Sequence, residues 1–403
     1  MLNKYVKDIE LFNTYYRIVD KEDACIADKL LQKYFNRDKL LVISWYTRNI
    51  TINLPHFFDN INDNIIHSLV NDPEYHIVFQ TDAEGWNMQQ FYVPLCASAS
   101  AYGIPFSKLV FITANLDIAK EYRNYSARTR FEPDGKLIAY NHFLVAMAQD
   151  LNFVAETYNR KIKFTLNDPE KYFDQMYKRK LKQDSNNVFL HLSRVCRHHR
   201  IMFNYLIDTN NEYKKYFSLS QDRVAKTQFE TMATQYYNID YDEIVSWSKR
   251  LPLAVDTTKF LFNYGLFDIT YLKLFSKYLI NIAGETNWGS NLFYSEKTFK
   301  PIGAMMPFLV YGNVGINKAL TNYGFKLYES LFDYSYDEEF NNVKRIELLV
   351  DMCTKLAARL EKYSWKEKVD VIMLGQKDII IHNYETLLKQ DDVLQQKIVT
   401  VNL

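Results

Sequence analysis

A glutamate and a lysine stand next to each other at the start of a predicted helix, as Glu296 and Lys297. A lysine ammonium is suited to phosphate, and a carboxylate accepts hydrogen bonds from ribose or sugar hydroxyls. Glu285, at the end of a preceding apolar run, supplies a second carboxylate. The pattern is typical of a nucleotide site. It is equally compatible with an ordinary helix start that Ser295 caps and that carries a surface ion pair.

A second cluster of basic residues follows an apolar run in the middle of the chain. It contains Arg194, Arg197 and Arg200 together with the pair His198 and His199. Guanidinium groups beside the free N–H groups of a helix start form a strong diphosphate site. A solvated basic turn and a nucleic-acid contact are the alternatives. The histidine pair does not suggest a metal site, because adjacent helical residues point in different directions.

Polar residues also end several predicted strands in the first half. Asp82 and Glu84 follow one of these strands, and either carboxylate is positioned to act as a general base. A plain loop carboxylate is the alternative for each. Asn115, Tyr140 and Asn141 end two further strands and are candidates to line the same site.

Seven short apolar runs, separated by stretches of helical character, are predicted to be the strands that position these residues. Strands alternating with helices indicate an α/β protein with parallel, doubly wound sheets. The runs lie at 39–45, 76–81, 108–113, 136–140, 187–192, 278–282 and 307–311. Residues 210–270 are predicted to be helices and loops.

A polar stretch at 155–186 lacks a clear strand and marks the predicted domain boundary. We expect a first Rossmann-like domain at 1–180 and a nucleotide-binding domain at 181–370. A C-terminal helix within 371–403 is expected to pack back on the first domain.

The composition is that of a globular protein with no strong charge, since hydrophobic residues are 48% and the net charge is +1. No apolar stretch is long enough to span a bilayer and no secretory signal precedes the first strand. The four widely spaced cysteines fit a reducing compartment, so a cytoplasmic location is expected. Neither a G-x-x-x-x-G-K-[ST] nor a G-x-G-x-x-G loop occurs, which disfavours a kinase or a dehydrogenase.

The second half resembles the nucleotide-sugar domain of fucosyltransferase-like glycosyltransferases and their relatives from tailed bacteriophages. In that family a strand leads into a Ser-x-Cys turn and an arginine that opens a helix, and a second strand leads through a glutamate to a Tyr-x-x-Glu-Lys helix start. The resemblance covers about residues 187–350, and the similar positions are Ser193, Cys196, Arg200, Glu285, Tyr294, Glu296, Lys297, Pro307 and Gly312, although Tyr294 stands only two residues before Glu296. Thr286-Asn287 replaces the family's Asn-Ser, which leaves the base and sugar of the donor open.

The resemblance implies a GT-B architecture, with two Rossmann-like domains facing across a cleft. The donor would be a UDP-, GDP- or other nucleotide sugar, and neither a bound cofactor nor a metal ion would be required. Asp82 or Glu84 would act as the base of an inverting reaction. The donor site would consist of Ser193, Arg194, Arg197, Arg200, Glu285, Tyr294, Ser295, Glu296 and Lys297.

The acceptor has two candidate classes. A phage enzyme would glycosylate hydroxymethylated pyrimidines in DNA, held by the basic run at 178–182 and by aromatic side chains. The abundance of Lys, Asn, Ile and Tyr, typical of AT-rich coding, is consistent with a phage source. A glycan, a lipid-linked sugar or a protein is the other class. A non-catalytic nucleic-acid-binding module with the same fold is a further alternative, and the sequence leaves the oligomeric state open.

Overall fold

A computed structural model describes most of the chain, and all structural statements below refer to that part. The described residues are 5–7, 16–18, 26–45, 54–81, 88–129, 134–158, 164–183, 187–193, 197–209, 212–221, 240–251, 253, 269–288, 291–395 and 399–402.

The first sheet has six strands in the order β1-β2-β3-β4-β5-β10. Its four central strands are parallel, and the two edge strands run antiparallel to their neighbours. The predicted strands at 39–45, 76–81, 108–113 and 136–140 are confirmed as the central four. The bounds are β1 (Tyr16–Ile18), β2 (Leu40–Trp45), β3 (His76–Thr81), β4 (Leu109–Thr113), β5 (Lys136–Ala139) and β10 (Val399–Asn402).

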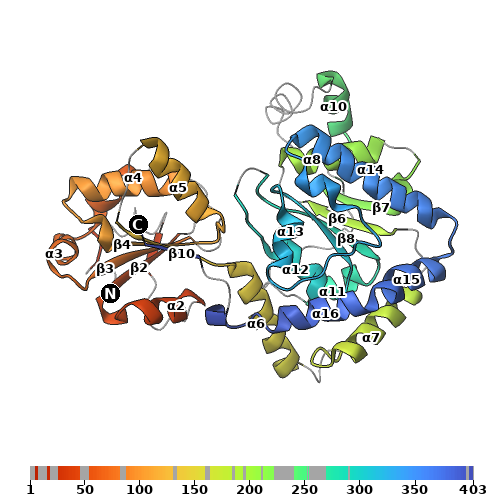
Figure 1. Cartoon of the computed structure of the whole chain (residues 1–403). Coiled ribbons are helices and arrows are strands. Elements are labelled where there is room, and N and C mark those ends of the chain that lie inside the picture. The colour runs from red at the N-terminus through yellow and green to blue at the C-terminus, as the bar shows by residue number, and fades with distance from the viewer. Residues whose placement is uncertain are drawn as a thin grey trace. The chain divides into compact units, whose positions relative to one another are not determined.

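Helices cover both faces of this sheet, but it is not doubly wound as predicted (Figure 1). The central strands follow chain order, so each right-handed crossover steps in the same direction and places its helix on the same face. That face packs against η4 (Leu54–Asn60), α3 (Asp63–Asn71), α4 (Met88–Ala101) and α5 (Ile118–Thr129). The other face packs against α2 (Ile26–Tyr34), the first turn of α6 (His142–Tyr158) and η10 (Val393–Gln395).

The second sheet has four parallel strands in the order β7-β6-β8-β9. The chain moves from β6 outward to β7 and then returns to the other side of β6, so the strand order reverses between β6 and β8. The predicted strands at 187–192, 278–282 and 307–311 are confirmed, whereas β7 lies in a segment predicted to hold only helices and loops. The bounds are β6 (Phe189–Ser193), β7 (Phe217–Gln221), β8 (Ile280–Gly284) and β9 (Phe308–Tyr311).

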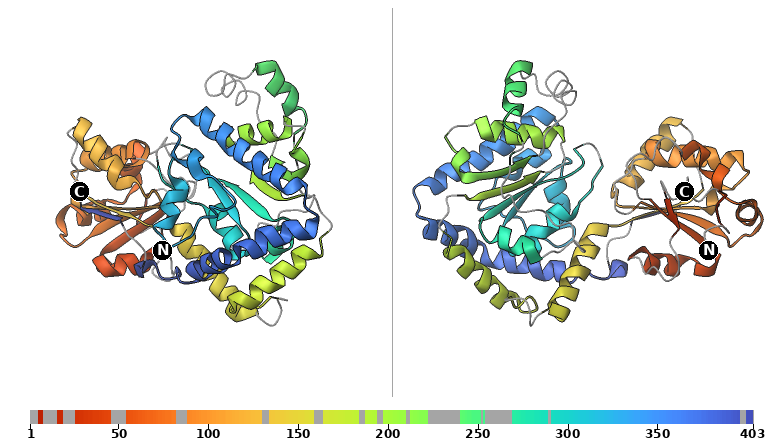
Figure 2. Two further views of the ribbon diagram at one scale, coloured as in Figure 1. Left: turned by 45° about the vertical axis from the view of Figure 1, so that its right-hand side comes forward. Right: turned by 180° about the vertical axis from the view of Figure 1, so that it is seen from behind.

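The helices of the second sheet lie on both of its faces (Figure 2). Since right-handed crossovers that step in opposite directions place their helices on opposite faces, α8 and α12 lie on different sides. Helix α14 packs beside α8, and α16 packs beside α12. The bounds are α7 (Pro169–Leu181), α8 (His198–Thr209), α10 (Tyr241–Ser248), α11 (Ile269–Phe275), α12 (Glu296–Gly303), α13 (Ile316–Thr321), α14 (Asn342–Glu361), α15 (Trp365–Met373) and α16 (Lys377–Leu388).

Contacts divide the chain into two compact units that interleave in sequence. Residues 1–145, 290–293 and 392–403 form one unit, and residues 146–289 and 294–391 form the other. The division falls at 145, not at the expected 180, because α7 packs against α15 and α16 and Asn152 of α6 donates a hydrogen bond to the Leu388 carbonyl. Of the C-terminal stretch, α16 stays in the second unit, and strand β10 joins the first.

Gly284, the last residue of β8, is required by the packing of the second sheet. A Cβ atom added there would lie 2.7 Å from the Tyr311 hydroxyl oxygen. We expect Gly284→Ala to lower the free energy of unfolding of the second unit by about 1–3 kcal/mol, because the buried Tyr311 ring, which is hydrogen-bonded to His191, would have to shift. Urea denaturation measures this.

Gly375→Ala is the matched control, since nothing lies within 4 Å of its added Cβ. It should leave the stability unchanged or raise it slightly. Equal losses in the two variants would show that Tyr311 does not fix the space at Gly284.

Candidate functional site

The described residues of the predicted donor site lie near the carboxyl ends of β6 and β8, where the strand order reverses. Ser193 is the last residue of β6, and Glu285 directly follows β8. In open α/β sheets, a reversal of strand order leaves a crevice at the carboxyl ends because the flanking helices diverge to opposite faces. The topology therefore places these residues where such folds bind ligands.

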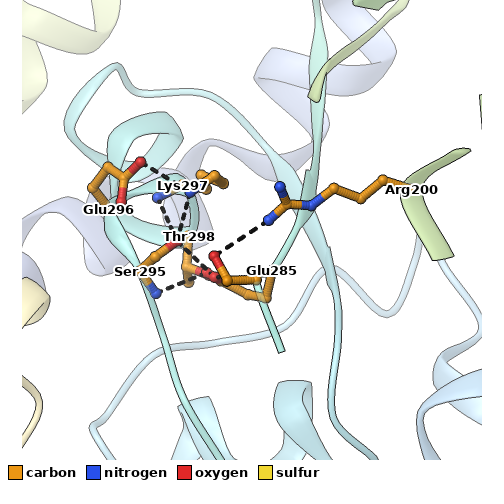
Figure 3. A network of polar contacts seen from close by, with 7 residues as sticks. Arg200, Glu285, Ser295, Glu296, Lys297 and Thr298 are labelled. Carbon is orange, nitrogen blue, oxygen red and sulfur yellow. Dashed lines mark hydrogen bonds and ion pairs between the residues drawn. The ribbon is translucent and has the colours of Figure 1, made fainter. Parts of the chain in front are cut away.

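The Glu285 carboxylate is fully buried and is held by three residues (Figure 3). One oxygen accepts hydrogen bonds from the Ser295 backbone N–H at 3.0 Å and from the Thr298 hydroxyl at 2.5 Å. The other accepts from the Ser295 hydroxyl at 2.6 Å and from the Thr286 N–H at 3.3 Å. Glu285 thus fixes the first turn of α12 to the end of β8.

The first turn of α8 is attached to the same point. His199 Nε2–H donates to the Glu285 carbonyl oxygen at 2.8 Å, and Arg200 Nη2 donates to the Thr286 hydroxyl at 3.4 Å. The N-termini of α8 and α12 therefore meet at Glu285 and Thr286. Because the N-terminus of each helix carries a partial positive charge, the meeting point favours an anion.

Charged side chains surround this meeting point at different depths. Lys297 Nζ lies 3.2 Å from the Ser295 hydroxyl and 3.0 Å from a Glu296 carboxylate oxygen, and the Lys297 side chain is 28% exposed. Arg197 is exposed immediately before α8, whereas Arg200 is buried. Burial raises the pKa of Glu296, but the positive charges of Lys297 and Lys300 outweigh burial and hold that pKa below its usual value. Glu296 is thus an ionised carboxylate.

Aromatic rings form the wall beside this meeting point. The His199 ring stacks on Trp288 with centroids 4.8 Å apart and an interplanar angle of 6°. The Arg345 guanidinium lies 3.8 Å from the Trp288 ring centroid, and its Nη2 donates to the Trp288 carbonyl at 3.5 Å. Because Arg345 is in the first turns of α14, a third helix begins beside the segment 285–288.

Buried hydrogen bonds connect Asn204, His191 and Tyr311, and the Tyr311 ring packs against His199 and Trp288. His191 Nδ1–H donates to the Asn204 side-chain oxygen at 2.7 Å, and the Tyr311 hydroxyl donates to His191 Nε2 at 2.8 Å. Burial lowers the pKa of His191 to about 3, so the ring is neutral and can accept from Tyr311. Burial also lowers the pKa of His199 well below its usual value, and the nearby Arg200 adds to this effect.

The predicted site residues, donor residues and candidate bases together, fall into three groups. Ser193, Glu285, Tyr294, Ser295 and Arg200 are buried within the second unit, and the Tyr294 hydroxyl donates to the Ile316 carbonyl at 2.5 Å. Arg197, Glu296 and Lys297 have exposed or half-buried side chains. Arg194, Cys196 and both candidate bases, Asp82 and Glu84, lie outside the described residues.

The asparagines that end strands of the first unit hold their own loops. The Asn115 side-chain oxygen accepts from the Asp117 N–H at 3.1 Å. The Asn141 side-chain oxygen accepts from the Leu144 N–H at 3.2 Å, at the start of α6. Tyr140 is buried beside them. These hydrogen bonds stabilise the local loops and give no indication that the residues bind a ligand.

The basic run at 178–182 is not a continuous basic surface. Lys180 is fully buried, and its ammonium donates to the carbonyls of Phe275 and Tyr278. Burial lowers the pKa of Lys180 to about 7. The Arg179 guanidinium lies 3.8 Å from the Phe164 ring centroid. Two of the cations expected to contact DNA are therefore engaged within the fold.

Several site residues had no individual signal in the sequence. Trp288, Thr298 and Arg345 lie in the predicted nucleotide segment or its downstream loop, but only the fold brings them to Glu285. The sequence singles out His199 only as one of a histidine pair with His198, and it does not indicate the stacking on Trp288. In the part of the chain that the structure describes, no group of three or more His, Cys, Asp or Glu side chains is arranged to hold a metal ion. No described helix is both long and apolar enough to cross a membrane.

Comparison with protein-family models finds no match, and comparison with curated protein sequences finds none either. Comparison with solved structures finds several distant matches, two of which are as follows. The N-terminal domain of trehalose-6-phosphate phosphatase from Candida albicans aligns with a TM-score of 0.45 and 10% identity, over 91% of this chain and 70% of that one. An α,α-trehalose 6-phosphate synthase from Burkholderia multivorans aligns with a TM-score of 0.38 and 12% identity, over 91% and 73%. The likeness is too distant to bear on activity.

Replacing the Glu285 carboxylate by an amide should destabilise the second unit. Glu285→Gln retains the shape but turns an N–H group toward donors, so at least one buried donor loses its acceptor. We expect a loss of about 1–3 kcal/mol in the free energy of unfolding of the second unit, measured by urea denaturation. Glu296→Gln, at the half-buried neighbouring carboxylate, should cost less. An equal cost would show that the buried hydrogen bonds do not hold α12.

The neutral His191 makes stability depend on pH. Its pKa is about 3 in the folded protein and about 6.5 in the unfolded chain, so only the unfolded chain takes up a proton as the pH falls below about 6.5. The contribution of His191 to the free energy of unfolding is therefore fully present above that pH. Below that pH it decreases by about 1.4 kcal/mol per pH unit. His191→Gln should reduce the slope of stability against pH between pH 6.5 and 5, by about half a proton at pH 6.5 and nearly one proton at pH 5. An unchanged slope would contradict the buried, neutral assignment.

Proposed function

We propose that this protein is a glycosyltransferase that takes a sugar from a nucleotide sugar and binds the diphosphate of that donor between the first turns of α8 and α12. One observation carries the proposal: both helix N-termini are bonded to Glu285 and Thr286, at the strand-order reversal of a parallel sheet. The two segments that build this point are those whose sequence resembles the nucleotide-sugar domain of fucosyltransferase-like enzymes.

The side chains have distinct roles in this proposal. Lys297 and Arg197 are accessible cations at the starts of α12 and α8, so they would contact the phosphates directly. Glu296 is ionised and would accept hydrogen bonds from ribose or sugar hydroxyls. Glu285, Ser295 and Thr298 are committed to one another and would position the helix instead of contacting the donor.

The proposed reaction displaces the nucleoside diphosphate from the anomeric carbon. An acceptor oxygen forms the new bond to that carbon, while the bond to the diphosphate oxygen breaks and its electron pair leaves with the diphosphate. The helix N-termini, Lys297 and Arg197 would stabilise the charge that develops there. In an inverting reaction the acceptor proton would pass to a carboxylate, for which Asp82 and Glu84 are the candidates. A GT-B arrangement of the two units is part of this proposal.

For the acceptor, the buried Lys180 and the stacked Arg179 favour a glycan, lipid-linked or protein hydroxyl over DNA. Activity on hydroxymethylated DNA would require phosphate contacts elsewhere in the chain. Such contacts make binding fall steeply with salt, so a salt titration with duplex DNA separates the two classes.

Binding of nucleoside diphosphates tests the proposed site. We expect calorimetry to detect UDP, GDP or another nucleoside diphosphate, and Lys297→Ala to raise the Kd about 10- to 100-fold, because it removes a charge-assisted hydrogen bond. Lys318→Ala is the control, since that lysine of the same unit is 78% exposed and pairs only with Glu338 among the contacts described for its side chain. It should leave the Kd unchanged. Absence of binding by the wild-type protein, or equal Kd values in both variants, would rule out the assigned site.

A further inference from the structure

Phe340 exposes 82% of its surface, the most of any large apolar residue in the described part of the chain. Burying a phenylalanine ring stabilises a fold, and this position forgoes that contribution. Single exposed apolar residues are common, so exposure alone assigns no role. Two further features distinguish Phe340: the chain is held in place on both sides of it, and it lies just before α14, which contacts the proposed donor site.

The chain before Phe340 is anchored at the carboxyl end of β9. The Asp337 carboxylate accepts hydrogen bonds from the N–H groups of Asn317 at 2.9 Å and Lys318 at 3.1 Å, in α13. The Asp337 carbonyl accepts from the Gly315 N–H at 2.7 Å. Because three residues span at most about 11 Å, Phe340 lies within that distance of Asp337.

The chain after Phe340 is anchored at the start of α14. The Asn341 side-chain oxygen accepts from the N–H groups of Val343 and Lys344 at 3.0 and 3.1 Å, which caps the helix. The Glu339 carboxylate accepts from the Asn341 N–H at 2.8 Å and pairs with Lys344 at 2.9 Å. Both neighbours of Phe340 are therefore held in place.

Helix α14 connects this loop to the proposed donor site. Arg345, in the first turns of α14, lies against Trp288, and Trp288 stacks on His199 at the start of α8. The exposed ring therefore stands on a loop fixed between the end of β9 and the wall of the site. A base stacked on this ring would belong to a nucleoside that extends from the diphosphate toward α14.

We propose that Phe340 stacks against the planar base of the donor nucleotide, an inference that rests on the proposed function. Stacking on an aromatic side chain contributes about 1–3 kcal/mol per base and tolerates any base, since every base has a flat face. The Glu339 carboxylate and the Asn341 side-chain oxygen are used within the loop, so they do not read the edge of the base. Phe340 therefore contributes affinity for nucleotides as a class.

Three ligands separate this role from phosphate binding: UDP, GDP and inorganic pyrophosphate. Phe340→Ala should raise the Kd of UDP and of GDP about 5- to 100-fold and leave that of pyrophosphate unchanged. Phe340→Trp keeps a flat ring and should restore nucleotide binding. Lys297→Ala should weaken all three ligands. Because the Phe340 side chain is exposed, the alanine variant should keep the wild-type thermal midpoint, which circular dichroism checks.

The outcomes distinguish the two proposals. If Lys297→Ala weakens the nucleotides and Phe340→Ala does not, the stacking role is overturned and the diphosphate site stands. An equal loss for pyrophosphate and nucleotides in Phe340→Ala also overturns stacking, because it would show a general effect on the site. If the wild-type protein binds none of the three ligands, both proposals fail.

Discussion

The buried carboxylate of Glu285 is the interaction on which the site depends. It directly follows β8, and it accepts hydrogen bonds from the N-cap residue and the first turn of α12. The start of α8 bonds to the same segment, since His199 donates to the Glu285 carbonyl and Arg200 donates to the Thr286 hydroxyl. A charge removed from water is costly unless it is fully hydrogen-bonded, and here four donors supply that compensation. The segment 285–286 also holds the two helix N-termini next to each other. The hydrogen bonds that compensate for the burial of Glu285 therefore also position the site.

This arrangement explains why the accessible charged side chains lie at the starts of α8 and α12. The buried members of the cluster set the direction of the helices. Among the predicted donor residues that the structure describes, Arg197 is exposed and Glu296 and Lys297 are half-buried. The two helix dipoles and two cations favour an anion, and the ionised Glu296 favours a hydroxyl-bearing group beside it. A phosphate joined to a sugar provides both an anion and neighbouring hydroxyl groups. This combination is the physical argument for a nucleotide sugar in preference to a simple anion.

The sequence predicts the framework well and the contacts poorly. Apolar runs identify the central strands of both sheets because each run is buried on both faces and lies between helices. Strand β7 is missed because Ser218 and Ser220 interrupt its apolar residues. The predicted donor segments do meet, since parallel strands present their carboxyl ends at one edge. The stacking of His199 on Trp288 and the burial of Lys180 depend on segments distant in sequence, so no local pattern indicates them.

Hydrogen exchange of backbone amides, measured with and without a nucleoside diphosphate, tests the central claim most directly. The account predicts slower exchange in the first turns of α8 and α12, within 197–202 and 294–299, because a bound diphosphate would lie against these helix N-termini and stabilise them. Unchanged exchange in both segments at saturating ligand, or protection confined to the first unit, would contradict it.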